Sequence, residues 1–227
     1  MNKYIISMVS TALLLLSANA NAFMLNFLEM ADGAYGESAW NQMVFTDIEN
    51  SGVDLIVTAY NANGKALAYL DANEAGLGVC STGLKDGASA DVMTGSSSNI
   101  CGEASDDNVS DNYAPGEYLM FSFMLGDDPF EVNGFSVTVN DNHADKSLEG
   151  HVIDMNGTPW ATQAQQTDTY FFDGASVFTV AFNKGQFYVE SLKVEPGGII
   201  TSVPEPTNLV LMGLAIIGLV ISRKKLS

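Results

Sequence analysis

Apolar and polar residues alternate with a period of two along much of the chain, and short clusters of Gly, Asn and Asp interrupt the alternation. Successive side chains of a strand point to opposite faces, so this pattern predicts β-strands that each have one buried face. The clearest example is the segment 53–60, in which one face carries Val53, Leu55, Val57 and Ala59. Strands are predicted over residues 53–60, 65–70, 118–125, 130–140, 151–155, 177–182 and 187–194.

Turn residues between these segments predict which strands are neighbours. Residues 61–64 (Asn-Ala-Asn-Gly) would join 53–60 to 65–70 in a hairpin. Asn156-Gly157 follows the segment 151–155, and Asn-Gly is the dipeptide most typical of a two-residue hairpin turn. Residues 183–185 (Asn-Lys-Gly) would join the last two segments in a final hairpin.

The segments together predict an all-β fold. Residues 118–125 are apolar on nearly both faces, which predicts a central buried strand, and 130–140 would direct Phe135, Val137 and Val139 inward. The stretch 24–30 is the only candidate for a helix. Many short strands with Gly, Asn and Asp turns are typical of a two-sheet β-sandwich, so we expect one jelly-roll-like sandwich over 23–196, followed by a linker at 197–203.

The N-terminus is typical of a signal peptide. Lys3 provides a basic residue, residues 5–16 are mostly apolar, and Ala20-Asn21-Ala22 has the small-x-small pattern that signal peptidase requires. We expect cleavage after Ala22, with cleavage after Ala20 as the alternative. An uncleaved N-terminal membrane anchor is the competing interpretation.

The C-terminus has three consecutive parts: Pro204-Glu205-Pro206, the apolar run 209–221, and the basic cluster 223–225. The apolar run would form a helix of about 20 Å, shorter than the roughly 30 Å of a bilayer core. Its length alone would also suit a buried core helix. The basic cluster at the extreme terminus favours a transient transmembrane helix whose C-terminal end stays in the cytoplasm.

The charge of the chain is strongly acidic. Formal net charge is −18, and removal of both terminal segments leaves 5 Lys and Arg against 26 Asp and Glu, a net charge of −21. Such a domain repels nucleic acid and anionic lipid, which excludes a nucleic-acid partner. The acidity suits solubility, divalent cations or neutral glycan surfaces.

Cys80 and Cys101 are the two cysteines of the chain. An even number of cysteines in an exported chain predicts a disulfide. The bond would close a loop rich in Gly, Ser and Asp and would contribute about 3 kcal/mol in the chain-entropy model.

Oxygen-bearing side chains gather in the loop before the segment 118–125. Ca²⁺ takes roughly six to eight oxygen ligands at about 2.4 Å, so the cluster is a candidate Ca²⁺ site. The expected ligands are Asp106, Asp107, Asn108 and Glu117, with Asp71 reaching across from the end of 65–70. The spacing differs from that of an EF-hand loop, and a solvated acidic turn is the alternative.

Catalytic motifs are absent from the sequence: there is no Ser/His/Asp order, nucleophile elbow, zinc spacing or phosphate-binding glycine loop. His143 and His151 fit a turn and a strand edge better than a metal or acid–base role. Aromatic residues could stack on sugars or belong to the core; the candidates are Trp40, Trp160, Tyr60, Tyr113 and Tyr170.

The C-terminal arrangement of Pro204-Glu205-Pro206, apolar run and basic cluster resembles the PEP-CTERM sorting signal. In exopolysaccharide-producing Gram-negative bacteria that signal is recognised by an exosortase. The segments 68–71, 76–80, 106–109 and 116–117 also look like a domain that recurs among PEP-CTERM proteins, without an assigned activity. The resemblance supports the cysteine pairing and the polar cluster as shared features.

These observations predict an exported protein that signal peptidase and an exosortase process. It would be held in the membrane by its tail and then reach the cell surface or the extracellular matrix. We expect a structural or glycan-binding β-sandwich without enzymatic activity, associated with exopolysaccharide or another surface glycan. The alternative is a secreted hydrolase that cleaves such a polymer with a carboxylate pair. A cleft with two carboxylates would favour the enzyme, and a flat face with exposed aromatic residues would favour binding.

Overall fold

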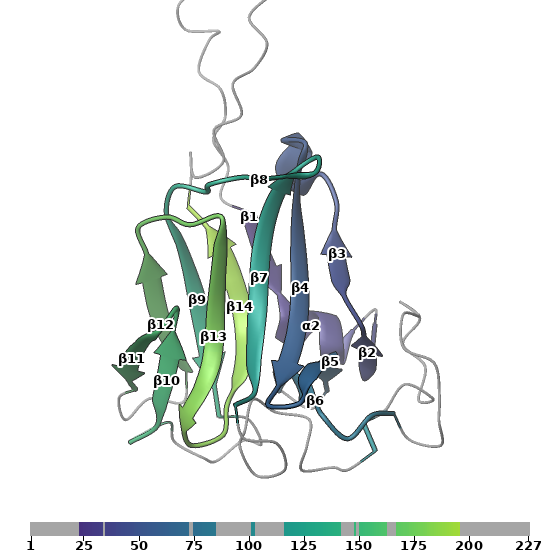
Figure 1. Ribbon diagram of the computed structural model, residues 1–227, viewed down its shortest axis with the longest axis vertical. Coiled ribbons are helices and arrows are strands. Elements are labelled where there is room, and N and C mark those ends of the chain that lie inside the picture. Colours follow the sequence, from purple (N-terminus) through teal and green to yellow (C-terminus); the bar gives the residue numbers. More distant parts are fainter. Residues whose placement is uncertain are drawn as a thin grey trace, which may run out of the picture.

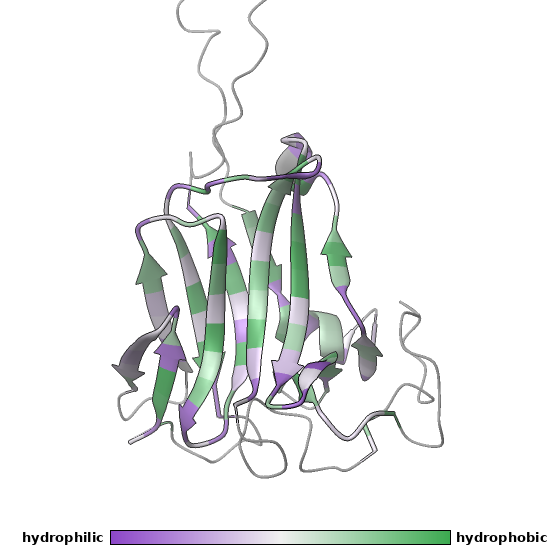
Figure 2. Cartoon of the chain, viewed as in Figure 1, coloured by the Kyte–Doolittle hydropathy of each residue, from purple (hydrophilic) through white to green (hydrophobic). Residues whose placement is uncertain are grey.

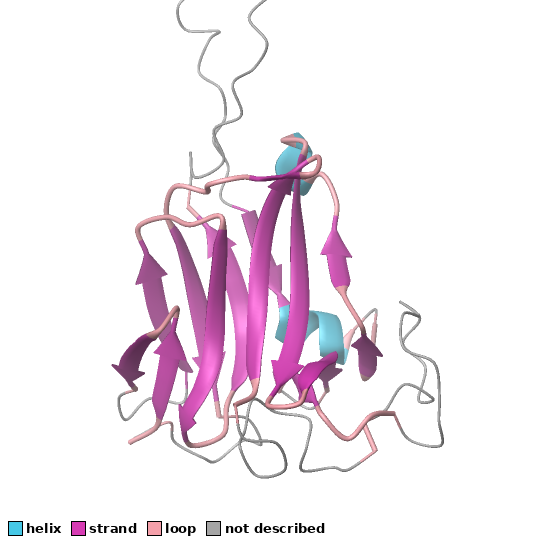
Figure 3. Cartoon of the chain, in the orientation of Figure 1, coloured by secondary structure: helices cyan, strands magenta, loops and turns pink. Residues whose placement is uncertain are grey.

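In the computed structural model, the described residues are 23–33, 35–72, 75–84, 101–102, 116–141, 148, 150–162 and 167–195. The predicted signal peptide with its cleavage site at Ala22 and the predicted C-terminal tail lie outside them. The described chain consists almost entirely of antiparallel strands, which confirms the all-β prediction (Figure 3).

The strands form two layers (Figure 1). The front layer contains β3 (Met43–Phe45), β4 (Val53–Asn61), β7 (Tyr118–Leu125), β8 (Asp128–Pro129), β10 (Val152–Met155), β11 (Thr158–Ala161) and β13 (Val177–Lys184). The back layer contains β1 (Phe23–Asn26), β2 (Ser38–Trp40), β6 (Gly76–Cys80), β9 (Phe135–Asn140), β12 (Thr167–Phe172) and β14 (Tyr188–Val194). Two short helices, α2 (Phe27–Asp32) and η1 (Ile48–Asn50), complete the described elements.

The strand β5 (Gly64–Asp71) joins the layers into one sheet, whereas the sequence predicted two. Its first residues pair with β4, where Ala66 is opposite Ala59, and its later residues pair with β6, where Leu67 is opposite Cys80. A strand that changes layers in this way turns a corner of the sandwich. The strand order along the folded sheet is β11-β10-β13-β7-β4-β5-β6-β14-β9-β12.

The alternation in the sequence correctly predicts which residues face the interior. Val53, Leu55, Val57 and Ala59 on β4 are fully buried, and polar colours alternate with apolar ones along the strands in Figure 2. The predicted central strand is β7, which pairs with β4 on one side and β13 on the other.

Two predicted hairpins are confirmed. Asn61 pairs with Gly64 at the tip of the β4–β5 hairpin. Asn156 and Gly157 join β10 to β11 with φ angles of +54° and +79°. Positive φ at both turn residues is the geometry that a two-residue type I′ turn requires, and Asn-Gly adopts it at little cost.

The predicted final hairpin is wrong. β13 pairs with β10 and β7 in the front layer, whereas β14 pairs with β1, β6 and β9 in the back layer. Both edges of β13 are occupied by other strands, so β14 has no free edge of β13 to pair with. The turn at 183–185 therefore leads the chain from one layer to the other.

Two further boundaries differ from the prediction. In 130–140, the strand begins only at Phe135, because Gly134 has a φ of +81° that interrupts extended backbone. The helix predicted within 24–30 begins only at Phe27, because β1 continues to Asn26. The side chain of Asn26 accepts a hydrogen bond from the Glu29 amide and so caps the N-terminus of α2.

The core lies between the layers and is rich in phenylalanine. Phe178 of β13 contacts Phe135 and Phe172 of the back layer, with ring centroids 4.5 and 5.0 Å apart. At one side of the core, Phe27 of α2 packs against Phe121. At the other side Trp160 meets Tyr170 edge to face, which links the two end strands β11 and β12.

Candidate functional site

Several residues predicted to be functional lie outside the described part of the chain. They are the sorting motif Pro204, Glu205 and Pro206, the signal cleavage site Ala22, and the metal candidates Asp106, Asp107 and Asn108. The described residues include the cysteine pair, Glu117 and Asp71.

The predicted disulfide is confirmed. Cys80 ends β6, and its sulfur is bonded to that of Cys101 with Cα atoms 5.7 Å apart. Both cysteines are buried in a small cluster with Ala39 and Tyr69. The bond therefore fastens the loop between the two cysteines to the end of β6.

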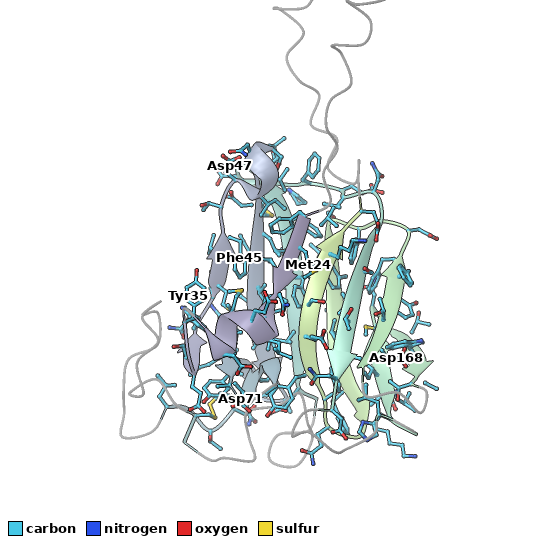
Figure 4. The ribbon with its side chains drawn as sticks, turned by 180° about the vertical axis from the view of Figure 1, so that it is seen from behind. Met24, Tyr35, Phe45, Asp47, Asp71 and Asp168 are labelled. Atoms are coloured by element: carbon cyan, nitrogen blue, oxygen red, sulfur yellow. A yellow bond between two sulfur atoms is a disulfide. The ribbon has the colours of Figure 1, made fainter. Side chains whose placement is uncertain are left out.

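Both described metal candidates are buried carboxylates that accept hydrogen bonds. Glu117 precedes β7 and accepts from the Ser81 hydroxyl. Asp71 ends β5 and accepts from the Tyr188 hydroxyl at 2.9 Å; its position in the back layer is marked in Figure 4.

Asp71 and Glu117 lie at opposite ends of β6. Asp71 is opposite Gly76 at the start of that strand, and Glu117 is bonded to Ser81 just past its end. Five residues of extended chain span about 16 Å, far more than the separation of two ligands on one Ca²⁺. The structure does not bring the two carboxylates together. Within the described residues, no group of three or more His, Cys, Asp and Glu is placed to hold a metal ion.

Within the front layer, the outer face of β4, β7 and β13 is largely uncharged. Residues on β4, β7 and β13 that alternate with the buried ones point outward, and charge appears only at the ends of this region, at Asp54 and Lys184. The outward residues between them are Ile56, Thr58, Tyr60, Tyr118, Met120, Ser122, Met124, Val177, Thr179 and Ala181.

One line of side chains crosses this face at right angles to the strands. Directly paired residues of neighbouring antiparallel strands lie on the same face, so the register defines the line. Its members, called the transverse row below, are Lys65, Tyr60, Tyr118, Ala181, Asp154 and Pro159, from β5, β4, β7, β13, β10 and β11.

Tyr60 and Tyr118 stack on each other on the outer face of the front layer, where β4 ends and β7 begins. Their ring centroids are 4.9 Å apart and the ring planes differ by 12°. Both side chains are half-buried, so part of the pair remains exposed to solvent. A stacked pair is rigid, and it offers apolar ring surface next to hydroxyl groups without adding charge.

The other sugar-stacking candidates are placed differently. Trp40 is buried, and Trp160 and Tyr170 pack against the core between the two end strands. Tyr113 and His143 lie outside the described residues. His151 lies against Gly185, where an added Cβ would come within 2.5 Å of the imidazole ring.

Of the predicted aromatic candidates that are described, Tyr60 alone lies on the uncharged face. Tyr118, on which Tyr60 stacks, was predicted only as part of a buried strand. The side chain of Tyr118 points outward because Leu119 and Phe121, on the opposite face of the strand, are buried. The contact between Tyr118 and Tyr60 results from the pairing of two distant segments.

Among the described residues, no helix is both long and apolar enough to cross a membrane. No family model matches the chain, and neither the curated proteins nor the solved structures contain a match to it.

Proposed function

We propose that this chain is an exported surface or matrix protein whose β-domain binds a glycan across the outer face of the front layer. The observation that carries the proposal is the stacked pair Tyr60 and Tyr118 on this outer face, at the end of β4 and the start of β7. The C–H faces of sugar rings pack on aromatic rings, while their hydroxyls find partners among neighbouring Tyr, Thr and Ser hydroxyls.

The spacing of the transverse row suits a polymer. Neighbouring strands are about 4.8 Å apart, so the six strands of the row span about 24 Å. The spacing between neighbouring strands is comparable to the length of one sugar unit in an extended glycan. A glycan chain lying across the strands would place successive units over successive strands.

Charge supports the choice of ligand class. The domain between the terminal segments carries 26 acidic and 5 basic residues, which repels polyanions such as nucleic acid or polyuronate. A neutral or cationic glycan would not face this repulsion.

The targeting part of the proposal rests on the two ends of the sequence. Signal peptidase would cleave after Ala22, and an exosortase would process the segment at Pro204-Glu205-Pro206 after the helix 209–221 has held the chain in the membrane. The Cys80–Cys101 disulfide supports export, because disulfides persist mainly in oxidising compartments.

A glycan array tests the binding proposal, with and without Ca²⁺ because of the acidic loop at 106–108. Wild-type protein is expected to bind at least one neutral or cationic polysaccharide, and the double variant Tyr60→Leu, Tyr118→Leu is expected to lose that binding. Phe171→Ala is the matched control, since Phe171 is an aromatic residue that is 69% exposed on β12 of the back layer. Binding that survives loss of both tyrosines would contradict the proposal.

A further inference from the structure

We infer that the transverse row contains a subsite for a sugar unit with a free amino group, placed over Ala181 between the ring of Tyr118 and the carboxylate of Asp154. This inference rests on the proposed glycan binding and adds the identity of the sugar. It follows from the register of three neighbouring strands, β7, β13 and β10.

Within the transverse row, the side chain of Ala181 is shorter than the two side chains next to it. Tyr118 is directly opposite Ala181, and Ala181 is directly opposite Asp154. Tyr118 and Asp154 are thus two strand spacings apart, about 10 Å. The methyl group of Ala181 between them is short and only half-buried. A single sugar ring fits such an interval between two larger side chains.

Tyr118 has one ring face available toward Ala181. Its other face is stacked on Tyr60, on the opposite side of β7, with nearly parallel ring planes. Because the two rings stack across the strands, the second face of Tyr118 is turned toward β13. An aromatic face in this position attracts both C–H groups and cations.

Asp154 supplies the opposite charge. Its side chain is half-buried, and no hydrogen bond or ion pair joins it to another of the described residues. Lys65 stands at the far end of the row, four strand spacings from Asp154, or about 19 Å. Lys184 lies on the same strand as Ala181, three residues away, opposite Val152. An ammonium group over Ala181 would therefore meet a ring face and a carboxylate, with Lys65 at a distance. Lys184 is a diagonal neighbour of Asp154, about 7–8 Å away, and no ion pair joins the two.

The same geometry discriminates among sugars. An N-acetyl group removes the positive charge, and a hydroxyl at the same carbon gives neither the cation–π contact nor the ion pair. A uronic acid would bring a carboxylate next to Asp154. The subsite should thus select a deacetylated amino sugar over its neutral and acidic counterparts.

The test compares three β-1,4-linked hexasaccharides that differ at carbon 2: the hexamers of glucosamine, N-acetylglucosamine and glucose. Binding to the full chain, kept in mild detergent, is measured by calorimetry at mildly acidic pH and low salt. We expect the glucosamine hexamer to bind about tenfold more tightly than the other two, the size expected for one exposed cation–π contact together with one exposed ion pair.

Two substitutions of equal charge separate a subsite from general attraction to an acidic protein. Asp154→Asn should remove the share of the preference that the ion pair supplies and reduce it from about tenfold to about threefold. Asp128→Asn removes the same charge from the exposed strand β8, which pairs with the other end of β7, and should leave the preference in place. Tyr118→Phe should also retain it, because the ring remains, whereas Tyr118→Leu should not.

The outcomes distinguish the two proposals. If the three hexamers bind equally, or if both Asn variants weaken glucosamine binding to the same extent, the amino-sugar subsite is wrong while glycan binding stands. If none of the hexamers binds and the glycan array is also blank, both proposals fail.

Discussion

The hydroxyl of Tyr188, at the start of β14, donates a hydrogen bond of 2.9 Å to the buried carboxylate of Asp71, at the end of β5. The two residues are 117 positions apart in the chain. The bond ties the strand that turns the corner of the sandwich to the back layer.

Tyr188→Phe should lower the free energy of unfolding by about 1–3 kcal/mol, because a buried carboxylate loses a donor. Tyr60→Phe removes a hydroxyl from a half-buried tyrosine on the front face and should have little effect. Urea denaturation of both variants checks the prediction. If Tyr188→Phe and Tyr60→Phe have the same free energy of unfolding, the Tyr188 hydroxyl contributes nothing to the stability of the fold.

Two glycines with the same backbone angle should respond differently to substitution. Gly64 and Gly76 both have a φ of +125°, which an alanine adopts with strain. An added Cβ at Gly64 meets nothing within 4 Å, whereas at Gly76 it lies 2.6 Å from the backbone oxygen of Val189.

Gly76→Ala should therefore destabilise the domain by about 1–3 kcal/mol more than Gly64→Ala, since only the former adds a clash between β6 and β14. Denaturant midpoints of the two variants measure the difference. A similar loss in both would show that backbone strain, and not the approach of the two strands, explains the glycine at position 76.

The disulfide should stabilise the domain without determining its fold. Replacing Cys80 and Cys101 together by serine is expected to cost about 2–4 kcal/mol, because the unfolded chain regains the freedom of the loop between them. Circular dichroism should still report the same β-structure. Two reactive thiols in the unreduced wild-type protein would rule out the bond.

Calcium should stabilise the protein if the acidic loop binds it. A ligand at a hundredfold excess over its Kd adds about 2.7 kcal/mol to the native state, so millimolar Ca²⁺ should raise Tm by several degrees. Asp107→Ala should abolish this effect. Na⁺ at matched ionic strength is the control, because screening depends on ionic strength and not on the identity of the ion. Equal shifts with both ions would identify a solvated acidic turn.

Processing at the C-terminus should depend on the two prolines of the sorting motif. Changing Pro204 and Pro206 to alanine is expected to leave a full-length precursor in the membrane of an exosortase-containing host. Mass spectrometry of the exported protein reports the outcome. A wild-type product that still ends at Ser227 would contradict processing.

Local features of the fold were predictable from the sequence because their causes are local. The alternation on β4 predicts its buried face, since a strand turns its side chains to opposite sides in a fixed order. Asn156-Gly157 predicts a hairpin because these two residues accept positive φ. Two cysteines leave a single pairing within the chain, and Cys80–Cys101 is formed.

Contacts between distant segments were decided by the tertiary structure. The period of two in 177–182 and 187–194 is compatible with a hairpin and equally with two strands in different layers. Because β13 pairs with β7 and β10, the two strands lie in different layers. Likewise, β6 (Gly76–Cys80) was not predicted as a strand, because its glycines hide the alternation. All five of its residues are buried, and β5, β14 and α2 lie against it.

The same distinction applies to the candidate site. The sequence indicates that Tyr60 lies on a strand, but it gives no sign that Tyr118, Ala181 and Asp154 lie beside it. Their neighbourhood comes from three strand registers that join segments far apart in the chain. A shift of one residue in any of them would turn a member of the row toward the core, so the register, which the packing of both layers determines, creates the row.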